Sequence, residues 1–404
     1  MFQFKSYLLI TLCCYIFLVF NDIFLYSFDL LFLTKVFFFF FSFLVLSTVK
    51  LQRNFYILLF LSIFFIFFGF LFTFLKGTYN SYSIGHSISI ATTLIFPLLS
   101  VFSLNILKDK IGCIVKAIIF SALFASFWKF LFIISSEWYP SLINILYPKI
   151  SGRGMQAGLE NVNTGNQMLI LISFILVALL YISYSKEMLK RLGSNSRFLS
   201  KGFLLVCLLV LYANALLSGS VFFIIMSTVI LYLMILFLTK NPLFRYFLFT
   251  LGTIGFIYII YFISQWIIEL RGEGFLSGVS IRLEQFIALF EEVLKSPFFG
   301  HGFGYFIESY LRNHDVLYLY EIQTVSAFMH FGILGVLMMV AILSMVFFSM
   351  KNLLSLRAFV YLMILMCGAS LLNPYLFGTY ASVSYFLIFL ISYLYQKNKY
   401  IGYN

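Results

Sequence analysis

The chain has 404 residues, of which 63% are hydrophobic and 10% are charged, and its mean hydropathy is +1.05. Soluble domains carry roughly 45–50% apolar and about 25% charged residues, so this composition excludes a soluble protein. Lysine and arginine outnumber aspartate and glutamate by 26 to 14, which gives a net charge of +12. In a soluble protein that excess would indicate a nucleic-acid partner. In a membrane protein it indicates cytoplasmic loops rich in basic residues, and we expect no nucleic-acid binding.

Apolar runs bounded by charged or turn residues recur along the whole chain, and each is predicted to cross the membrane as a helix, which takes about 20 apolar residues. The twelve runs are 6–21, 30–49, 55–75, 84–107, 115–134, 167–185, 202–217, 220–239, 246–268, 325–349, 358–373 and 377–395. The region 202–239 is either two spans separated at Ser218-Gly219-Ser220 or one span and a re-entrant segment. The sequence therefore predicts an all-α integral membrane protein with about twelve transmembrane helices and a single polytopic domain over residues 1–404.

The charges divide between the two sides that this topology defines. With a cytoplasmic N-terminus, the inner segments hold 17 basic and two acidic residues, whereas the outer segments hold seven basic and twelve acidic residues. An excess of lysine and arginine marks cytoplasmic loops, so both termini are predicted to be cytoplasmic. Two outer segments are long, 135–166 and 269–324. Long polar loops on one side of a bundle are where function is expected.

The second long loop contains a helical pattern. Its apolar positions are Leu283, Phe286, Ile287, Phe290, Val293 and Leu294, and its acidic positions on the other face are Glu284, Glu291 and Glu292. This spacing predicts an amphipathic helix over 283–294, lying at the membrane surface. Ser296-Pro297 ends the helix, and the glycines at positions 300, 302 and 304 predict a flexible turn that allows close approach of the backbone.

Histidines and acids in the second loop are the candidates for acid–base chemistry. His314 is the preferred general base, because a neutral imidazole suits that task and Asp315 could orient the ring. The alternative is that the loop histidines, His301 among them, are only interfacial polar residues. No metal-ligand spacing is present, so no metal is expected.

Cations outside the membrane are candidates for binding phosphate, because the arginine fork pairs bidentately with phosphate oxygens. The outer arginines are Arg153, Arg271, Arg282 and Arg312. Lys129 lies near the outer end of a predicted span, where it either extends to the interface or binds phosphate. No aspartate or glutamate lies deep in a predicted span, where coupled transporters usually place one.

Three motifs follow one another in the outer segments. The first motif, R…SP-x-x-G-x-G-x-G, consists of Arg282, the amphipathic helix and Ser296-Pro297 with the three glycines. The second consists of His314-Asp315 and Leu317, followed by Gly332-x-x-Gly335. The third begins at Gly152-Arg153 and continues to Gly158, Asn161 and Asn163. Their order resembles the O-antigen polymerase and O-antigen ligase superfamily, over roughly 150–340. The chain departs from that pattern at Ser220-Val221, where relatives carry Ser-Arg, and at Asp315, where Asn is commoner.

The resemblance implies an enzyme without cofactors, an inverting glycosyltransferase at the periplasmic face of the bacterial inner membrane. Its donor is a glycan on undecaprenyl diphosphate, and its other partners are membrane lipids and, as a candidate, a chain-length regulator protein. The catalytic candidates are then His314, Asp315 and Glu321. The candidates for binding the diphosphate are Arg153, Arg282, Arg312 and Lys129. Further loop candidates are His301, Glu308 and Asn163.

The preferred function is the O-antigen polymerase, which moves the growing chain onto the next lipid-linked repeat unit. The alternatives are the ligase that transfers the finished chain to lipid A–core and a polymerase of capsule or exopolysaccharide. A lipid-linked oligosaccharide flippase belongs to a different class and would place its cations inside the bundle. The long outer loop and the near absence of charge inside the predicted spans disfavour it.

Overall fold

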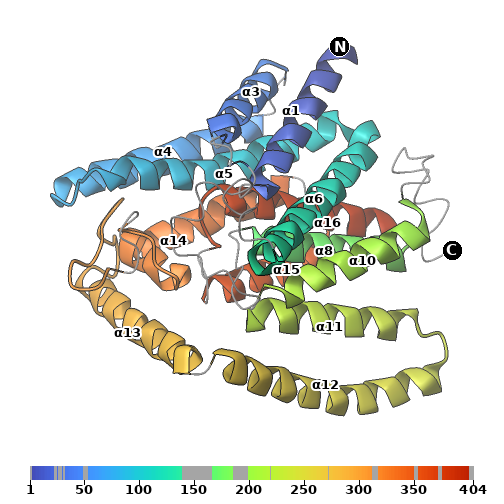
Figure 1. The fold of residues 1–404 in the computed structure, drawn as a ribbon. Helices are drawn as coiled ribbons and strands as arrows, with labels where there is room; N and C mark the ends of the chain where they lie inside the picture. Colours follow the sequence, from blue (N-terminus) through green and yellow to red (C-terminus); the bar gives the residue numbers. More distant parts are fainter. Residues whose placement is uncertain are drawn as a thin grey trace. The chain divides into compact units, whose positions relative to one another are not determined.

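The computed structural model describes twelve stretches of the chain: 2–21, 25, 30, 32–48, 53–138, 166–184, 199–218, 220–271, 273–311, 317–349, 354–371 and 375–399. Within these stretches every regular element is a helix (Figure 1). The elements are α1 (Phe2–Phe20), α3 (Phe32–Thr48), α4 (Arg53–Leu75), α5 (Tyr82–Ile106), the 3-10 turn η1 (Lys108–Lys110), α6 (Ile111–Trp138), α8 (Gln167–Ile182), α10 (Lys201–Leu216), α11 (Val221–Leu238), α12 (Pro242–Arg271), α13 (Glu273–Lys295), α14 (Gln323–Ser349), α15 (Leu356–Ser370) and α16 (Thr379–Lys399).

Each of the twelve predicted spans coincides with one of these helices, and α13 contains the predicted amphipathic segment 283–294. The region 202–239 forms two helices, α10 and α11, separated at residues 217–220. In the described part of the chain, five helices are long and apolar enough to cross a bilayer: Gln3–Phe20, Arg53–Leu75, Tyr82–Ile106, Lys108–Ile134 and Gln323–Ser349. The fold is all-helical over the described residues and indicates a membrane-embedded protein. Twelve crossings and cytoplasmic termini stay predictions.

Large apolar side chains also cover the outer surface of the helices. Phe39 and Phe237 are each 71% exposed, and Phe67 is 64% exposed. Monomeric soluble proteins rarely expose apolar patches of this extent, because water solvates them poorly. Lipid solvates them well, so the exposed surface agrees with the composition.

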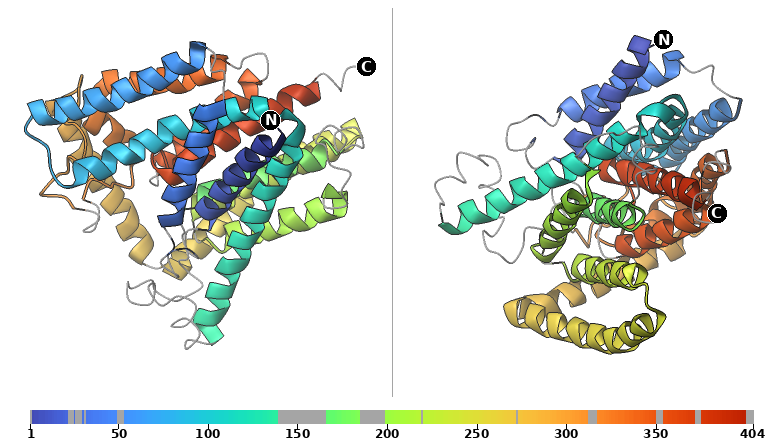
Figure 2. Two further views of the ribbon diagram at one scale, coloured as in Figure 1. Left: turned by 90° about the horizontal axis from the view of Figure 1, so that it is seen from above. Right: turned by 90° about the vertical axis from the view of Figure 1, so that its right-hand side faces the viewer.

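The backbone groups into two compact units, each built from two separate stretches of chain. Unit 1 comprises Met1–Phe40 and Leu107–Leu276, and unit 2 comprises Phe41–Ile106 and Ser277–Asn404. In unit 1, α1 packs against α6, while α8 packs against α10 and α11, and α11 contacts α12 (Figure 2).

Unit 2 is organised around α5. This helix packs against α16 and α4, and α14 packs against both α4 and α5 (Figure 1). Because neighbours surround α5, its polar side chains Ser83, His86 and Ser87 are buried despite lying near one end of the helix. The polar segment between α13 and α14 bonds to this end of α5 and to the adjoining end of α4, so it belongs to the same unit.

Candidate functional site

Helix α14 is interrupted at Gly332, whose backbone has φ 62° and ψ −176°. An interrupted helix leaves N–H and C=O groups without partners on both sides of the break. The loop that follows α13 supplies those partners through four backbone hydrogen bonds. They are His301 N to Met329 O (2.9 Å), Gly302 N to His330 O (2.8 Å), Ile333 N to Pro297 O (2.8 Å) and Leu334 N to Phe298 O (3.1 Å). The SP-x-x-G-x-G stretch and the G-x-x-G stretch of the sequence therefore fit together.

Glycine is required where the two backbones meet. A Cβ added to Gly332 would lie 2.3 Å from the backbone of Phe298, and one added to Gly300 would lie 2.3 Å from the carbonyl oxygen of His330. Both glycines also have positive φ, which side chains disfavour. These glycines allow the loop to enter the break in the helix.

The adjoining ends of α4 and α5 bind the same loop through polar side chains. Thr73 Oγ1 accepts from Phe303 N (2.8 Å), and His86 Nδ1 accepts from Gly304 N (3.0 Å). The carbonyl oxygens of the loop accept three further hydrogen bonds. Thr78 Oγ1 donates to His301 O (2.7 Å), Ser83 Oγ to Phe303 O (2.8 Å) and Asn80 Nδ2 to Gly304 O (2.9 Å).

Every backbone N–H from residue 300 to residue 304 is thus bonded within the protein, since Gly300 N donates to Ser296 O (3.0 Å). The prediction of a flexible turn is wrong for the described loop. Sequence spacing indicated close approach of the backbone but could not show what it approaches. These amides are occupied, so a phosphate would have to be bound by side chains.

Glu292 is a buried carboxylate at the centre of an ionisable cluster whose other members are partly or largely exposed. Its Oε1 accepts from Lys295 Nζ (2.6 Å) and its Oε2 accepts from Tyr305 Oη (2.9 Å). His301 Nε2 donates to the Glu292 carbonyl oxygen (3.0 Å), lies 3.6 Å from Glu292 Oε2, and its ring stacks on Tyr305 at 4.2 Å.

The cluster sets the charge states of its members. Burial alone would raise the pKa of Glu292, but the hydrogen bonds from Lys295 and Tyr305 and the charge of Lys295 bring it below its usual value. Burial, assisted by the positive charges of Lys76 and Lys295, lowers the pKa of His301. We therefore assign an ionised Glu292 and a neutral His301 at neutral pH, and Nε2 of His301 is occupied by the carbonyl group that it binds.

Helix α13 buries a mixed stripe of two polar residues and one apolar residue, while Glu284 and Glu291 are exposed. Gln285, Leu289 and Glu292 are buried, at most 8% exposed. The apolar stripe is exposed at Leu283 (60%), Phe286 (42%), Ile287 (50%), Phe290 (46%) and Leu294 (63%). The helix thus packs within unit 2 through Gln285, Leu289 and Glu292, and its large apolar side chains are exposed.

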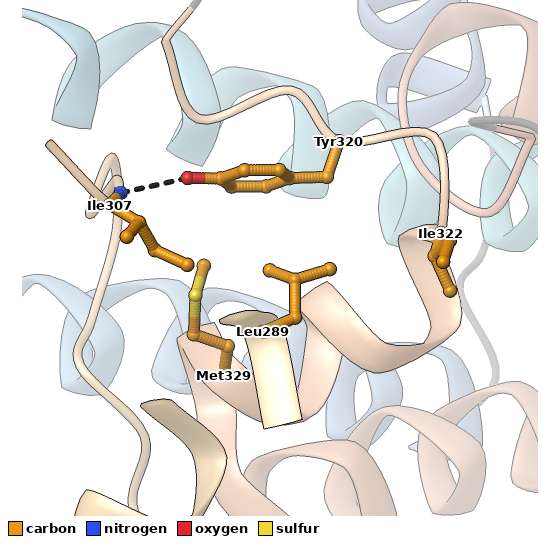
Figure 3. Close-up of a cluster of buried hydrophobic side chains, with 5 residues drawn as sticks. All are labelled: Leu289, Ile307, Tyr320, Ile322 and Met329. Atoms are coloured by element: carbon orange, nitrogen blue, oxygen red, sulfur yellow. Dashed lines mark hydrogen bonds between the residues drawn. The ribbon is translucent and has the colours of Figure 1, made fainter. Parts of the chain in front are cut away.

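A small hydrophobic cluster joins α13, the loop and the start of α14 (Figure 3). Its buried members are Leu289, Ile307, Tyr320, Ile322 and Met329. Ile307 N donates to Tyr320 Oη (2.8 Å), and burial raises the pKa of Tyr320 to about 12, so the phenol remains neutral.

Two of the predicted site residues form an ion pair at this place. Arg282 Nε lies 3.1 Å from Glu321 Oε2, and the two side chains are 39% and 23% exposed. Gln285, one turn after Arg282, accepts from Ile322 N through Oε1 (2.9 Å), so the helix and the residue after Glu321 are fixed to each other. The pair is accessible and is positioned by buried contacts.

The other predicted site residues form no such pair among the described residues. Glu308 is exposed in the same loop. Arg153, Asn163, Arg312, His314 and Asp315 lie outside the described residues.

Lys129 belongs to unit 1 and is 2% exposed, with Nζ 3.3 Å from the backbone oxygen of Asn214 and 3.4 Å from its Oδ1. The amine is enclosed between α6 and α10, so in this structure Lys129 neither extends to the interface nor is accessible to a diphosphate, contrary to both predicted roles.

Sequence reasoning gave no role to the histidines inside the helices. His86 and His330 meet with ring centroids 4.4 Å apart, and His86 stacks on Tyr318 at 4.4 Å. His330 Nε2 donates to Tyr305 O (3.0 Å). The two rings thus bond to the backbone of the loop, His86 at Gly304 and His330 at Tyr305. Because the paired residues are distant in sequence, residue spacing could not predict these contacts. Among the described residues no group of three or more His, Cys, Asp or Glu could hold a metal ion.

No protein-family model, curated protein or solved structure matches the chain. The resemblance to a superfamily rests on the motifs alone.

Proposed function

We propose that the protein is an O-antigen polymerase, a glycosyltransferase that uses a lipid-linked donor. A hydroxyl oxygen of the acceptor repeat unit attacks the anomeric carbon of the growing chain. The bond from that carbon to the diphosphate oxygen breaks, undecaprenyl diphosphate leaves, and the hydroxyl proton passes to a base on the enzyme. The reaction inverts the anomeric configuration because a single displacement occurs.

The ion pair between Arg282 and Glu321 is the observation that carries this proposal. A leaving diphosphate requires cations where negative charge develops. Glu321 contacts Arg282 through Nε, and guanidinium has five N–H donors, so a side chain 39% exposed retains donors for phosphate oxygens. A carboxylate that holds an arginine in one orientation reduces the cost of organising it in the transition state.

The base is assigned to His314, which the motif places between Leu311 and Leu317 of the same loop, shortly before Glu321. Asp315 and Glu321 are the nearby acids that could orient the imidazole. His301 is the alternative base: its Nε2 donates to the Glu292 carbonyl group, which fixes the ring and leaves Nδ1 as the nitrogen that could accept a proton.

The phenotype of a gene deletion distinguishes the candidate functions. Loss of a polymerase leaves lipid A–core carrying a single repeat unit, whereas loss of the ligase leaves bare core. Loss of a capsule or exopolysaccharide polymerase leaves the lipopolysaccharide unchanged and removes that polymer. Accumulation of inward-facing lipid-linked intermediate would instead identify a flippase and overturn the proposal.

Purified variants test the roles of the residues. His314→Ala should bind the lipid-linked donor normally but extend chains roughly 10²–10⁴-fold more slowly, which is the usual contribution of a general base. Arg282→Ala should weaken donor binding, and Arg282→Lys should restore little, because lysine lacks the bidentate fork. Arg357→Ala, which removes an exposed arginine at the start of α15, is the matched control. Wild-type extension by His314→Ala would place the base elsewhere, and full activity of Arg282→Lys would reject the bidentate contact.

A further inference from the structure

Helix α4 carries a ladder of phenylalanines at every fourth position. Phe60 stacks on Phe64, Phe64 on Phe68, and Phe68 on Phe72, with ring centroids 6.2, 6.1 and 6.3 Å apart. At 1.5 Å per residue the ladder is about 18 Å long. Phe60, Phe64 and Phe68 are 65%, 44% and 40% exposed, so most of the ladder is accessible from outside unit 2.

Three members of the ladder, Phe64, Phe68 and Phe72, form one wall of an apolar groove of about 260 Å³ within unit 2. Leu334 and Met338 of α14 line the opposite wall, and Phe299 of the loop contacts Phe72 at 5.3 Å. His330 is the one ionisable residue among those lining the groove. The groove therefore suits a hydrocarbon chain, and its loop end lies at Phe299 and Gly302 of the α13–α14 loop.

A cation stands at the loop end of the ladder. Lys76 Nζ lies 5.1 Å from the centre of the Phe72 ring, donates to Gly300 O (2.7 Å) and also bonds to Ser296 Oγ. An ammonium group has three donors, so one remains for a further acceptor, and Lys76 is exposed. The apolar groove, along which the ladder runs from Phe64 to Phe72, thus ends at a positive charge.

We propose that this groove binds the chain of a polyprenyl diphosphate, with Lys76 contacting its phosphate. A groove that follows a single phenylalanine ladder accommodates one chain for one anionic head, whereas a glycerophospholipid brings two chains. The charge complements the phosphate, and the apolar walls complement the chain. This inference rests on the proposed function for the identity of the lipid. Lys76 bonds to Ser296 at the end of α13, about 20 Å along that helix from Arg282, so the two cations hold different phosphates.

Photo-crosslinking on the full chain in vesicles of phosphatidylethanolamine and phosphatidylglycerol tests the site. Benzoylphenylalanine replaces Phe68, which lines the groove, or Phe67, which is 64% exposed but is not among the lining residues. With radiolabelled undecaprenyl diphosphate, position 68 should capture the label at least tenfold more than position 67. Unlabelled undecaprenyl diphosphate should compete, and added phosphatidylglycerol should not.

Two further substitutions probe the head and the chain separately. Lys76→Gln should lower capture at position 68 about tenfold, and Lys76→Arg should retain it. Leu334→Trp should fill the groove and abolish capture, while Leu337→Trp, at an exposed position on the same helix that does not line the groove, should leave it unchanged. The apparent melting temperature of each variant in detergent separates loss of binding from loss of folding.

The outcomes separate this proposal from the polymerase. Equal capture at positions 67 and 68, competition by phosphatidylglycerol, or wild-type capture by folded Lys76→Gln overturns the groove site, even if chain extension is intact. Saturable capture that depends on Lys76 in a protein that extends no chains supports the lipid site and overturns the polymerase.

Discussion

Gly332 combines a φ of 62° with a ψ of −176°, a region that side chains essentially never adopt. The residue also meets the backbone of Phe298 so closely that a Cβ has no space. Both constraints exist because the α13–α14 loop enters the break in α14. The integrity of the candidate site therefore depends on a residue that has no chemistry of its own.

Replacing Gly332 with alanine should destabilise unit 2 by about 1–3 kcal/mol from backbone strain, with the overlap adding to that cost. Gly368→Ala is the matched control, because that helical glycine in the same unit has no atom within 4 Å of an added Cβ. The control should be neutral or slightly stabilising, by about 0.5–1 kcal/mol. Apparent melting temperatures in detergent compare the two, and equal temperatures would show that the break in α14 tolerates a side chain.

The cluster around Glu292 should make the loop sensitive to acid. His301 has a pKa below its ordinary 6.5, so its neutral form contributes stability that is present above pH 6.5 and is lost as the pH falls toward the lower folded value. Glu292 has a pKa below its ordinary 4.5, so its contribution is lost at still lower pH. The groups facing His301 are Glu292, Lys76, Lys295 and Tyr305, and both lysines disfavour its protonation.

Hydrogen exchange of residues 297–305, corrected for intrinsic rates, should therefore accelerate between pH 7 and pH 5 in the wild type. His301→Gln keeps an amide donor for the Glu292 carbonyl group and removes the titration, so its protection should change less over the same interval. An identical pH dependence in the two proteins would assign the sensitivity to another group.

At the scale of the element, the apolar spacing of α13 correctly predicts a helix, but it does not predict which of its residues make the buried contacts. The apolar repeat predicts a helix at the membrane surface, and the structure has a helix over these residues with the apolar stripe exposed. The buried contacts come from Gln285, Leu289 and Glu292, whose partners lie in the loop and at the start of α14. Because these three residues pack inward, the large apolar side chains are left for lipid.

Environment-sensitive labels along α13 should therefore report two different surroundings. We use a variant without native cysteines and attach nitrobenzoxadiazole to a single cysteine at position 286 or 290. In vesicles, this label should emit at a shorter wavelength than the same label on a free cysteine in water. The same label at position 284 or 291, where the native residues are exposed glutamates, should emit as in water. Equal emission at all four positions in vesicles would refute insertion of the stripe into lipid.

At the scale of the whole molecule, the sequence predicts the helices, because local composition determines them. It does not predict the contacts between backbone segments that are distant in sequence. Runs of Phe, Ile and Leu predict the helices closely, as in 55–75 for α4 and 84–107 for α5. The break at Gly332 was not foreseen, because Gly332 lies in an apolar run that reads as one continuous span. The ion pair of Arg282 with Glu321 joined two predicted residues, but the roles of Lys76, His86 and Glu292 depend on tertiary contacts that no spacing encodes.

The topology of the whole chain is the prediction on which the proposed chemistry depends. Seventeen basic residues on one side, against seven on the other, predict that 135–166 and 269–324 are periplasmic and that 186–201 is cytoplasmic. Reporter fusions at Asn161 and Glu308 should give a periplasmic signal, active for alkaline phosphatase and inactive for a fluorescent protein that folds only in the cytoplasm. A fusion at Ser194 should give the opposite signal and is the internal control. Because undecaprenyl-linked repeat units are joined outside the cytoplasm, a cytoplasmic signal at Glu308 would remove Arg282, Glu321 and Lys76 from their substrate and reject the polymerase.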